Sequence, residues 1–134
     1  MPRGNWSDDS SIPHDAPLWR KVEQDEISDD GQAPSSGVLI TFEVSVSIGS
    51  ETTPELLFAK GRALGYDWCR IWEFTAAQAR AAGCIADRDP VLDNPNLALN
   101  DPAHAVVLCA DGPGVKRVKQ SSAKKLQLAG QWRV

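Results

Sequence analysis

Cysteines are few in this sequence. Cys69, Cys84 and Cys109 are its only three, and none of them belongs to a CxxC motif. An odd number of widely spaced thiols argues against a disulfide framework and against a four-ligand zinc site. Because a free cysteine packs as a small apolar residue, we expect buried thiols at the edges of helices and strands.

Long apolar runs are absent as well. No stretch approaches the roughly 18 apolar residues that suggest a membrane-spanning helix, and the N-terminal MPRGNWSDDSS lacks the apolar segment of a signal peptide. We therefore expect a cytoplasmic protein with no membrane partner. At 134 residues and 42% hydrophobic content, the chain is long enough to fold as one domain with its own core.

Familiar signatures of catalysis and cofactor binding are also missing. There is no GxSxG motif, no Cys/His catalytic signature and no Walker motif. The glycine-rich residues 112–116 lack phosphate-loop spacing, and their proline removes a backbone donor, which favours a turn. One of the two histidines, His14, falls in a polar N-terminal segment, so the sequence predicts neither a metal site nor a cofactor.

Charge is unevenly distributed along the chain. The net charge is −4, yet residues 112–134 contain six basic side chains and no acidic one. A basic segment can contact nucleic acid, and the candidates are Lys116, Arg117, Lys119, Lys124 and Lys125. We favour a solvated helix face that complements the acidic body, and we expect nucleic-acid binding to be weak or absent.

The strongest structural signal is Val38–Ile48, where apolar and polar residues alternate. The apolar positions are Val38, Ile40, Phe42, Val44, Val46 and Ile48. A period of two predicts a strand with one buried and one solvated face, on which the rest of the domain is organised. Phe42 and Val44 should lie in the core, and a shift of one residue would bury Glu43.

The chain before this strand is polar. Residues 1–15 are rich in Ser, Asp, Gly and Pro, a composition that predicts a mobile segment preceding a single domain over residues 16–134. Residues 16–37 place isolated apolar side chains among charges, and we interpret them as an arm lying on the domain. Within this arm, Asp29–Gly31 predicts a turn, and Ala33–Gly37 should run extended before turning into the strand.

A helix is predicted after the strand. Thr53 supplies a capping hydroxyl, Pro54 suits the first helical position, and Gly65 suits the left-handed residue that ends a helix. We expect this helix to lie against the apolar face of the strand.

The next segments alternate between ordered and irregular patterns. Tyr66–Phe74 fits both strand and helical spacing, and its aromatic content favours a strand. Thr75 should then cap a short helix over Ala76–Ala82. Cys84–Pro102 contains three prolines that follow Asp or Asn and predicts a long irregular loop, whereas His104–Cys109 predicts a buried strand.

The C-terminal part predicts a last helix over Val115–Ala129, with Val115, Val118, Ser122 and Leu126 on one side. Residues 131–134 either close the sheet as a final strand or place Trp132 in the core. The predicted fold class is therefore α+β: a single small domain with a mainly antiparallel sheet and two or three helices.

One constellation carries candidate chemistry. Asp101 and His104 stand at the boundary between the long loop and a strand, and a catalytic histidine requires an orienting acceptor and an open approach. Ser35, Ser36 and Cys109 are candidate nucleophiles, although no local motif supports them. The alternative is that His104 binds loop backbone and holds the proline-rich segment in place, and this alternative is favoured.

Several short motifs together resemble a family of small uncharacterised bacterial proteins. That family has an L-[WY]-R-R start, an R-P-S-S turn, a strand containing S-V, an F-T-A stretch and an N-P-A-H-A motif. The corresponding stretches here are Leu18–Lys21, Pro34–Ser36, Phe42–Val46, Phe74–Ala76 and Asp101–Ala105. Ala33 replaces the family arginine and Asp101 the family asparagine. The resemblance implies a bacterial domain and draws attention to Ser35, Ser36 and His104, without supplying a reaction.

Three functions remain open. The favoured one is a non-enzymatic protein-interaction or accessory domain of bacterial or mobile-element origin, with an unidentified protein as partner. The second is a small hydrolase or transferase that uses His104 with Asp101 and Ser35 or Ser36. The third is a weak nucleic-acid binder through the basic C-terminal helix.

Overall fold

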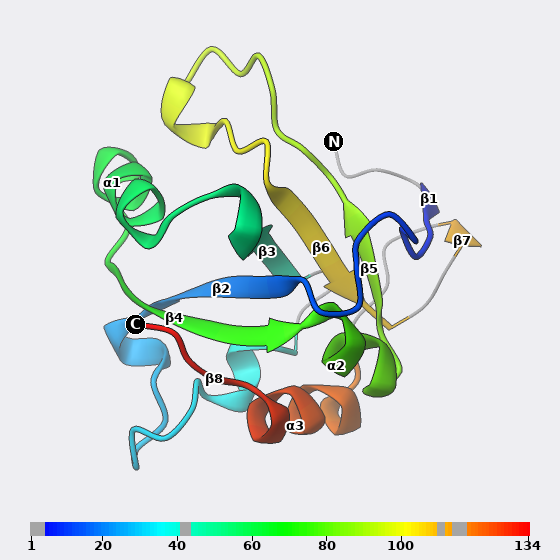
Figure 1. Ribbon diagram of the computed structural model, residues 1–134. Coiled ribbons are helices and arrows are strands. Elements are labelled where there is room, and N and C mark those ends of the chain that lie inside the picture. The colour runs from blue at the N-terminus through cyan, green and yellow to red at the C-terminus, as the bar shows by residue number, and fades with distance from the viewer. Residues whose placement is uncertain (1–4, 41–43, 110–111, 114–117) are drawn as a thin grey trace.

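An antiparallel sheet forms the centre of the fold (Figure 1). In this computed structural model, which describes residues 5–40, 44–109, 112–113 and 118–134, six strands follow the order β5–β6–β3–β2–β4–β8. Every neighbouring pair is antiparallel. The strands are β2 (Pro17–Glu23), β3 (Val44–Ile48), β4 (Trp68–Thr75), β5 (Ile85–Arg88), β6 (His104–Leu108) and β8 (Gln131–Trp132).

Helices lie on both faces of this sheet (Figure 1). Two of them, α2 and α3, pack on one face, while α1 and the short 3-10 helix η4 lie on the other. Their bounds are α1 (Pro54–Leu64), α2 (Ala76–Ala81), α3 (Gln120–Ala129) and η4 (Leu97–Leu99). The predicted single α+β domain with a mainly antiparallel sheet is confirmed.

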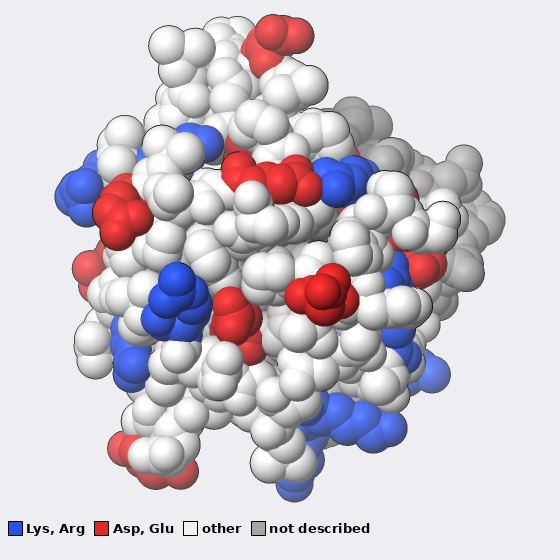
Figure 2. Space-filling view, in the orientation of Figure 1, with Lys and Arg blue, Asp and Glu red and all other residues white. Residues whose placement is uncertain are grey.

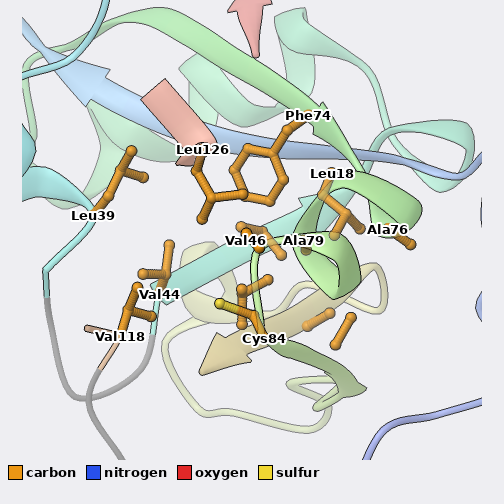
Figure 3. Close-up of a cluster of buried hydrophobic side chains, with 14 of the residues drawn as sticks. Leu18, Leu39, Val44, Val46, Phe74, Ala76, Ala79, Cys84, Val118 and Leu126 are labelled. Atoms are coloured by element: carbon orange, nitrogen blue, oxygen red, sulfur yellow. The ribbon is translucent and has the colours of Figure 1, made fainter. Parts of the chain in front are cut away.

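The main core lies between the sheet and the α2/α3 layer. Val44 and Val46 of β3 face Phe74 of β4 and Leu126 of α3 (Figure 3), and each of the four is 1% exposed or less. Burying an aliphatic or aromatic side chain stabilises a fold by roughly 1.5–3 kcal/mol before conformational entropy is subtracted. The predicted burial of Val44 is confirmed, whereas Phe42 lies outside the described residues.

The predicted strand Val38–Ile48 is too long at its start. Ser36–Val38 forms a 3-10 turn, and the described part of β3 begins at Val44. The N–H groups of Val38 and Leu39 donate to the carbonyls of Ser35 and Ser36, at 3.1 and 3.0 Å, so local bonds replace strand pairing there. These two adjacent side chains are both buried, so the start of the segment does not follow the period of a strand with one solvated face.

The interpretation of residues 16–37 as a surface arm is wrong for its first part. Pro17–Glu23 is strand β2, which pairs with β3 on one side and β4 on the other. Leu18 and Val22 are fully buried in the α2/α3 core, and Trp19 is buried on the opposite face. A strand that is covered on both faces lacks the alternation of a half-exposed strand, and the charged Arg20 also interrupts the apolar run. The sequence pattern therefore did not indicate a strand here.

The ends of α1 agree with the sequence prediction. The Thr53 hydroxyl accepts a hydrogen bond from the Leu56 N–H at 3.2 Å, and Gly65 adopts a left-handed φ of 81°. The predicted packing face is wrong, because Leu57 contacts Trp19 and Ile71 rather than the main core. The apolar face of β3 is already covered by α2 and α3, so α1 lies on the other side.

Strand β4 confirms the strand interpretation of Tyr66–Phe74, and Thr75 caps α2 with its hydroxyl, which accepts from Gln78 N–H at 3.1 Å. The predicted loop Cys84–Pro102 is wrong at its start, since Ile85–Arg88 pairs with β6 as β5. Those four residues form a strand because their backbone pairs with β6. The turn-forming residues in the sequence did not indicate this pairing.

The last helix begins later than predicted. α3 starts at Gln120, and Val118 and Lys119 precede it, while residues 115–117 lie outside the described part. Val118, Ser122 and Leu126 are buried together, as the sequence spacing predicted. Trp132 belongs to a final strand, β8, which pairs with β4 at the sheet edge.

The N-terminal segment packs on the domain over its described part. Trp6 and Ile12 are 2% and 1% exposed, and β1 (Asn5–Trp6) pairs with β7 (Gly112–Pro113). These two large side chains offset the ordering cost that the polar composition implied. None of the helices in the described ranges is long and apolar enough to cross a membrane.

Candidate functional site

A cavity of about 410 Å³ lies between α1, the η4 loop and the sheet face opposite α2 and α3. Its position follows from the way β2 and β3 separate. The two strands pair only at Leu18↔Ile48 and Trp19↔Ser47 among the described residues, and the next residues of β2, Arg20 and Lys21, line the resulting gap. The cavity thus opens where the centre of the sheet is incomplete.

Lys21 carries an amine into this cavity. Its Nζ lies 4.5 Å from the centroid of the Trp68 ring, a cation–π contact. Burial lowers the pKa of Lys21 to about 8; Asp101 opposes this change, while the nearby charges of Arg20 and Lys60 add to it. No hydrogen-bond acceptor from the described part of the chain reaches this amine.

Arg20 is the second cation in the gap. Its Nη1 donates to the carbonyl of Ser45 on β3 at 3.1 Å, which bridges the separated strands. Its Nε is buried and has no hydrogen-bond partner among the described residues. Burial lowers the pKa of this guanidinium, and the carboxylate of Glu26 opposes that effect. An unsatisfied buried donor is costly, so this site is not optimised for stability alone.

Lys60 brings a third cation from α1. Its Nζ donates to the carbonyl of Asn100, which follows η4. The bond joins the helix to the loop that forms the other wall of the cavity. Three cationic side chains from two elements therefore line one cavity.

The carboxylates that line the cavity already have donors. Glu26 accepts from the Glu23 N–H at 2.8 Å, and Glu23 accepts from the Asp67 N–H at 3.3 Å. Asp101 accepts from the Ser47 hydroxyl at 2.7 Å and from the Ala103 N–H at 3.0 Å. Each of these carboxylates thus has at least one donor, whereas Lys21 has no acceptor among the described residues.

The remaining wall is apolar. Tyr66 and Trp68 stack with ring centroids 5.0 Å apart and an interplanar angle of 7°. Leu57 and Leu64 of α1 and Leu99 of η4 complete this side. The cavity therefore combines charged side chains of both signs with an apolar wall, and Lys21 lies against that wall at Trp68.

The predicted pair Asp101 and His104 lines the cavity, but the two side chains do not bond each other. His104 Nδ1 lies 2.8 Å from the Asp89 carbonyl and 3.5 Å from its Oδ2. Asp101 instead pairs with Ser47, which is fully buried, so the polar side of β3 is not the solvated face that the alternation predicted. The histidine ties β6 to the start of loop 89–103.

The two predicted serine nucleophiles lie elsewhere. Ser35 and Ser36 belong to the turn before Val38, and neither lines the cavity. The Ser35 N–H donates to the Glu26 carbonyl at 2.8 Å, which anchors that turn. The structure therefore does not bring these hydroxyls together with His104.

The predicted nucleic-acid residues fall at the α3 end of the molecule. Lys119 is the residue before α3, and Lys124 and Lys125 are exposed on it, whereas Lys116 and Arg117 lie outside the described residues. Figure 2 shows basic side chains at the lower edge of that face, around α3, and acidic and basic side chains interspersed above them.

Metal ligation has no geometric basis in the described ranges, where no group of three or more His, Cys, Asp or Glu side chains is placed to hold an ion. Comparison with protein-family models, with curated proteins and with solved structures finds no match for this chain. The resemblance to the small bacterial family accordingly stays a prediction.

Sequence reasoning missed the cations Arg20, Lys21 and Lys60. One signal was present, because two adjacent cations interrupt the buried segment Leu18–Val22. A charged pair inside a strand is uncommon unless the side chains reach a cavity or a partner. Lys60 had no such signal, because charges are ordinary on an exposed helix.

Proposed function

We propose that this domain binds a small amphiphilic anion, with its acidic group at Lys21 and its apolar part along α1. The observation that supports this most directly is the imbalance of hydrogen bonding. Lys21 has no acceptor among the described residues, while the cavity carboxylates Glu23, Glu26 and Asp101 each have donors. An anion would supply the acceptor that this amine lacks.

The ligand chemistry follows from the walls. A carboxylate or phosphate group fits the cations Lys21, Arg20 and Lys60, and an alkyl or aryl group fits Trp68 and Leu99. A volume of about 410 Å³ is that of a small-molecule site rather than of a polymer groove. The proposal agrees with a binding domain that is not an enzyme.

Catalysis by the predicted histidine has less support. His104 Nδ1 is occupied by Asp89, and Asp101 is occupied by Ser47 and the backbone. Ser35 and Ser36 are outside the cavity wall. The Nδ1 contact leaves Nε2 as the nitrogen that could act as a base, but neither predicted serine lines the cavity beside it, so the predicted base and nucleophiles are not brought together.

Exposed leucines beside the cavity support the second candidate function, binding of a protein partner. Leu92 and Leu97 of loop 89–103 are 59% and 78% exposed, and Leu56 of α1 is 48% exposed. Exposed leucines on the two elements that border the cavity would suit a partner segment with apolar side chains. This second candidate predicts binding that does not depend on Lys21.

Calorimetry with octanoate, and with octylamine as the oppositely charged probe, tests the anion proposal. We expect octanoate to bind and octylamine not to bind. Lys21→Met should weaken octanoate binding at least tenfold, because a hydrogen bond to a charged group contributes about 1.5–3 kcal/mol. Lys124→Met, on the exposed side of α3, serves as the matched control and should leave affinity unchanged.

Affinity should also fall as the pH rises above about 8, where Lys21 loses its proton in the free protein. Lys60→Met provides a second variant in case Lys21→Met disturbs folding, which a thermal melt would reveal. Equal affinity of Lys21→Met and the unchanged protein, or a preference for octylamine, would contradict the anion site.

A further inference from the structure

Two of the three thiols meet at the edge of the sheet. The Sγ atoms of Cys84 and Cys109 are 3.8 Å apart. Each cysteine stands one residue beyond the last β5–β6 pair, Ile85↔Leu108. Opposite residues of antiparallel strands have Cα atoms about 4.5–5.5 Å apart, within the range that a disulfide spans. Forming the bond would bring the two Sγ atoms from 3.8 Å to about 2.05 Å.

Cys109 is the more accessible of the two. It is partly exposed, and its Sγ accepts a hydrogen bond from the Lys119 N–H at 3.1 Å, immediately before α3. The same Sγ lies 3.4 Å from the Ser122 hydroxyl. These contacts hold the sulfur in one position, directed at a partner that is already in van der Waals contact.

Cys84 has the opposite surroundings. It is 5% exposed, and burial raises the pKa of its thiol to about 12. Backbone bonding fixes it as well, because its N–H donates to the Ala79 carbonyl at 3.0 Å. A buried thiol of this kind does not meet an oxidant first, but it can react with a sulfur that already touches it.

We propose that Cys84 and Cys109 form a reversible thiol–disulfide pair, oxidised by hydrogen peroxide and re-reduced by a dithiol. Cys109 Sγ, after releasing its proton, attacks one peroxide oxygen; the O–O bond breaks and the other oxygen leaves as water. The sulfenic acid is then attacked by Cys84 Sγ, the S–OH bond breaks, and the hydroxyl leaves as a second water with the Cys84 proton.

A dithiol reduces the disulfide back to two thiols. A dithiol such as dithiothreitol supplies two electrons and two protons, which restore both thiols, and it becomes its own disulfide. The bond would join the two ends of the segment that carries β5, loop 89–103 and β6. This inference does not rest on the anion site, since neither cysteine lines the cavity.

The test is hydrogen peroxide treatment of the folded protein, followed by thiol titration and peptide mapping by mass spectrometry. Of three free thiols, we expect one to remain, on Cys69, with Cys84 and Cys109 linked within one chain and released by dithiothreitol. Cys69→Ser is the matched control and should form the same disulfide.

Single-cysteine variants identify the order of attack. Cys84→Ser should leave Cys109 as a sulfenic acid that dimedone traps, and Cys109→Ser should leave Cys84 reduced. The second variant replaces a partly exposed residue, so it keeps the test valid if Cys84→Ser does not fold. Three unreacted thiols under peroxide that oxidises a free cysteine peptide, or disulfides between chains only, would overturn the proposal.

Discussion

At the scale of single residues, Lys21 shows how a binding site and stability oppose each other. Its side chain is partly buried, with the amine against Trp68 and no acceptor in the described structure, so the folded state disfavours its charge. The pKa falls from 10.5 to about 8. The unfolded chain therefore binds more protons than the folded protein between these two values, and stability should rise with pH across that window.

We predict that Lys21→Met stabilises the protein at pH 7 and that its advantage shrinks between pH 8 and 10.5. Below pH 8 both states carry the proton, and the folded state bears the full cost of the buried charge. Above 10.5 neither state is charged, and the cost disappears. Urea unfolding at pH 7 and 10 measures the difference, with Lys124→Met as the exposed control. An advantage equal at both pH values would show that charge burial is not its cause.

At the scale of elements, the junction between α3 and β8 depends on a close approach. Gly130 follows α3 with a φ of −80°, so no left-handed conformation is required there. A Cβ at this position would lie 2.3 Å from Trp72 Nε1 and 2.9 Å from the Glu73 carbonyl oxygen. Trp72 is buried and its Nε1 donates to the Leu126 carbonyl, so it has little freedom to move.

Gly130→Ala should consequently destabilise the domain by about 1–3 kcal/mol, the usual cost of overpacking, and loosen the pairing of Trp72 with Trp132. Chemical denaturation and tryptophan fluorescence measure these two effects. Gly37→Ala is the matched control, since nothing lies within 4 Å of a Cβ there. If both variants unfold at the same denaturant concentration as the unchanged protein, the close approach of residue 130 to Trp72 does not restrict which side chain fits there.

At the scale of the whole molecule, a Cys84–Cys109 bond would close a long segment of chain. The two residues are 25 positions apart, and the segment includes β5, loop 89–103 and β6. Cross-linking removes conformations from the unfolded state, and a loop of this size corresponds to roughly 3–4 kcal/mol in the chain-entropy description. The contact of 3.8 Å between the thiols implies little distortion of the folded state.

We therefore expect peroxide-oxidised protein to unfold at higher urea concentration than reduced protein, with the difference removed by dithiothreitol. Cys69→Ser should show the same increase, and Cys109→Ser should show none. A lower unfolding midpoint after oxidation, with the disulfide present, would mean that the bond strains the β5–β6 edge.

Features that depend on neighbouring residues were predictable from the sequence alone. The capping hydroxyls of Thr53 and Thr75 and the left-handed Gly65 act on backbone groups a few residues away, so they predicted helix boundaries without any knowledge of the fold. The alternation that ends at Ile48 predicted the buried face of β3, because successive side chains of a strand point to opposite faces wherever the strand lies in the fold. Asp101 and His104 were placed at a loop-to-strand boundary, and both line the cavity.

Contacts between distant segments were decided only by the tertiary structure. That Pro17–Glu23 is a central strand depends on pairing with β3 and β4, which come later in the chain. Lys21 and Lys60 share a cavity because β2 and β3 separate beneath α1. Cys84 and Cys109 touch because β5 and β6 pair in one register. Each contact joins residues far apart in the chain, and its loop-closure cost is offset only by the assembled sheet, so a pattern of neighbouring residues does not specify the partner.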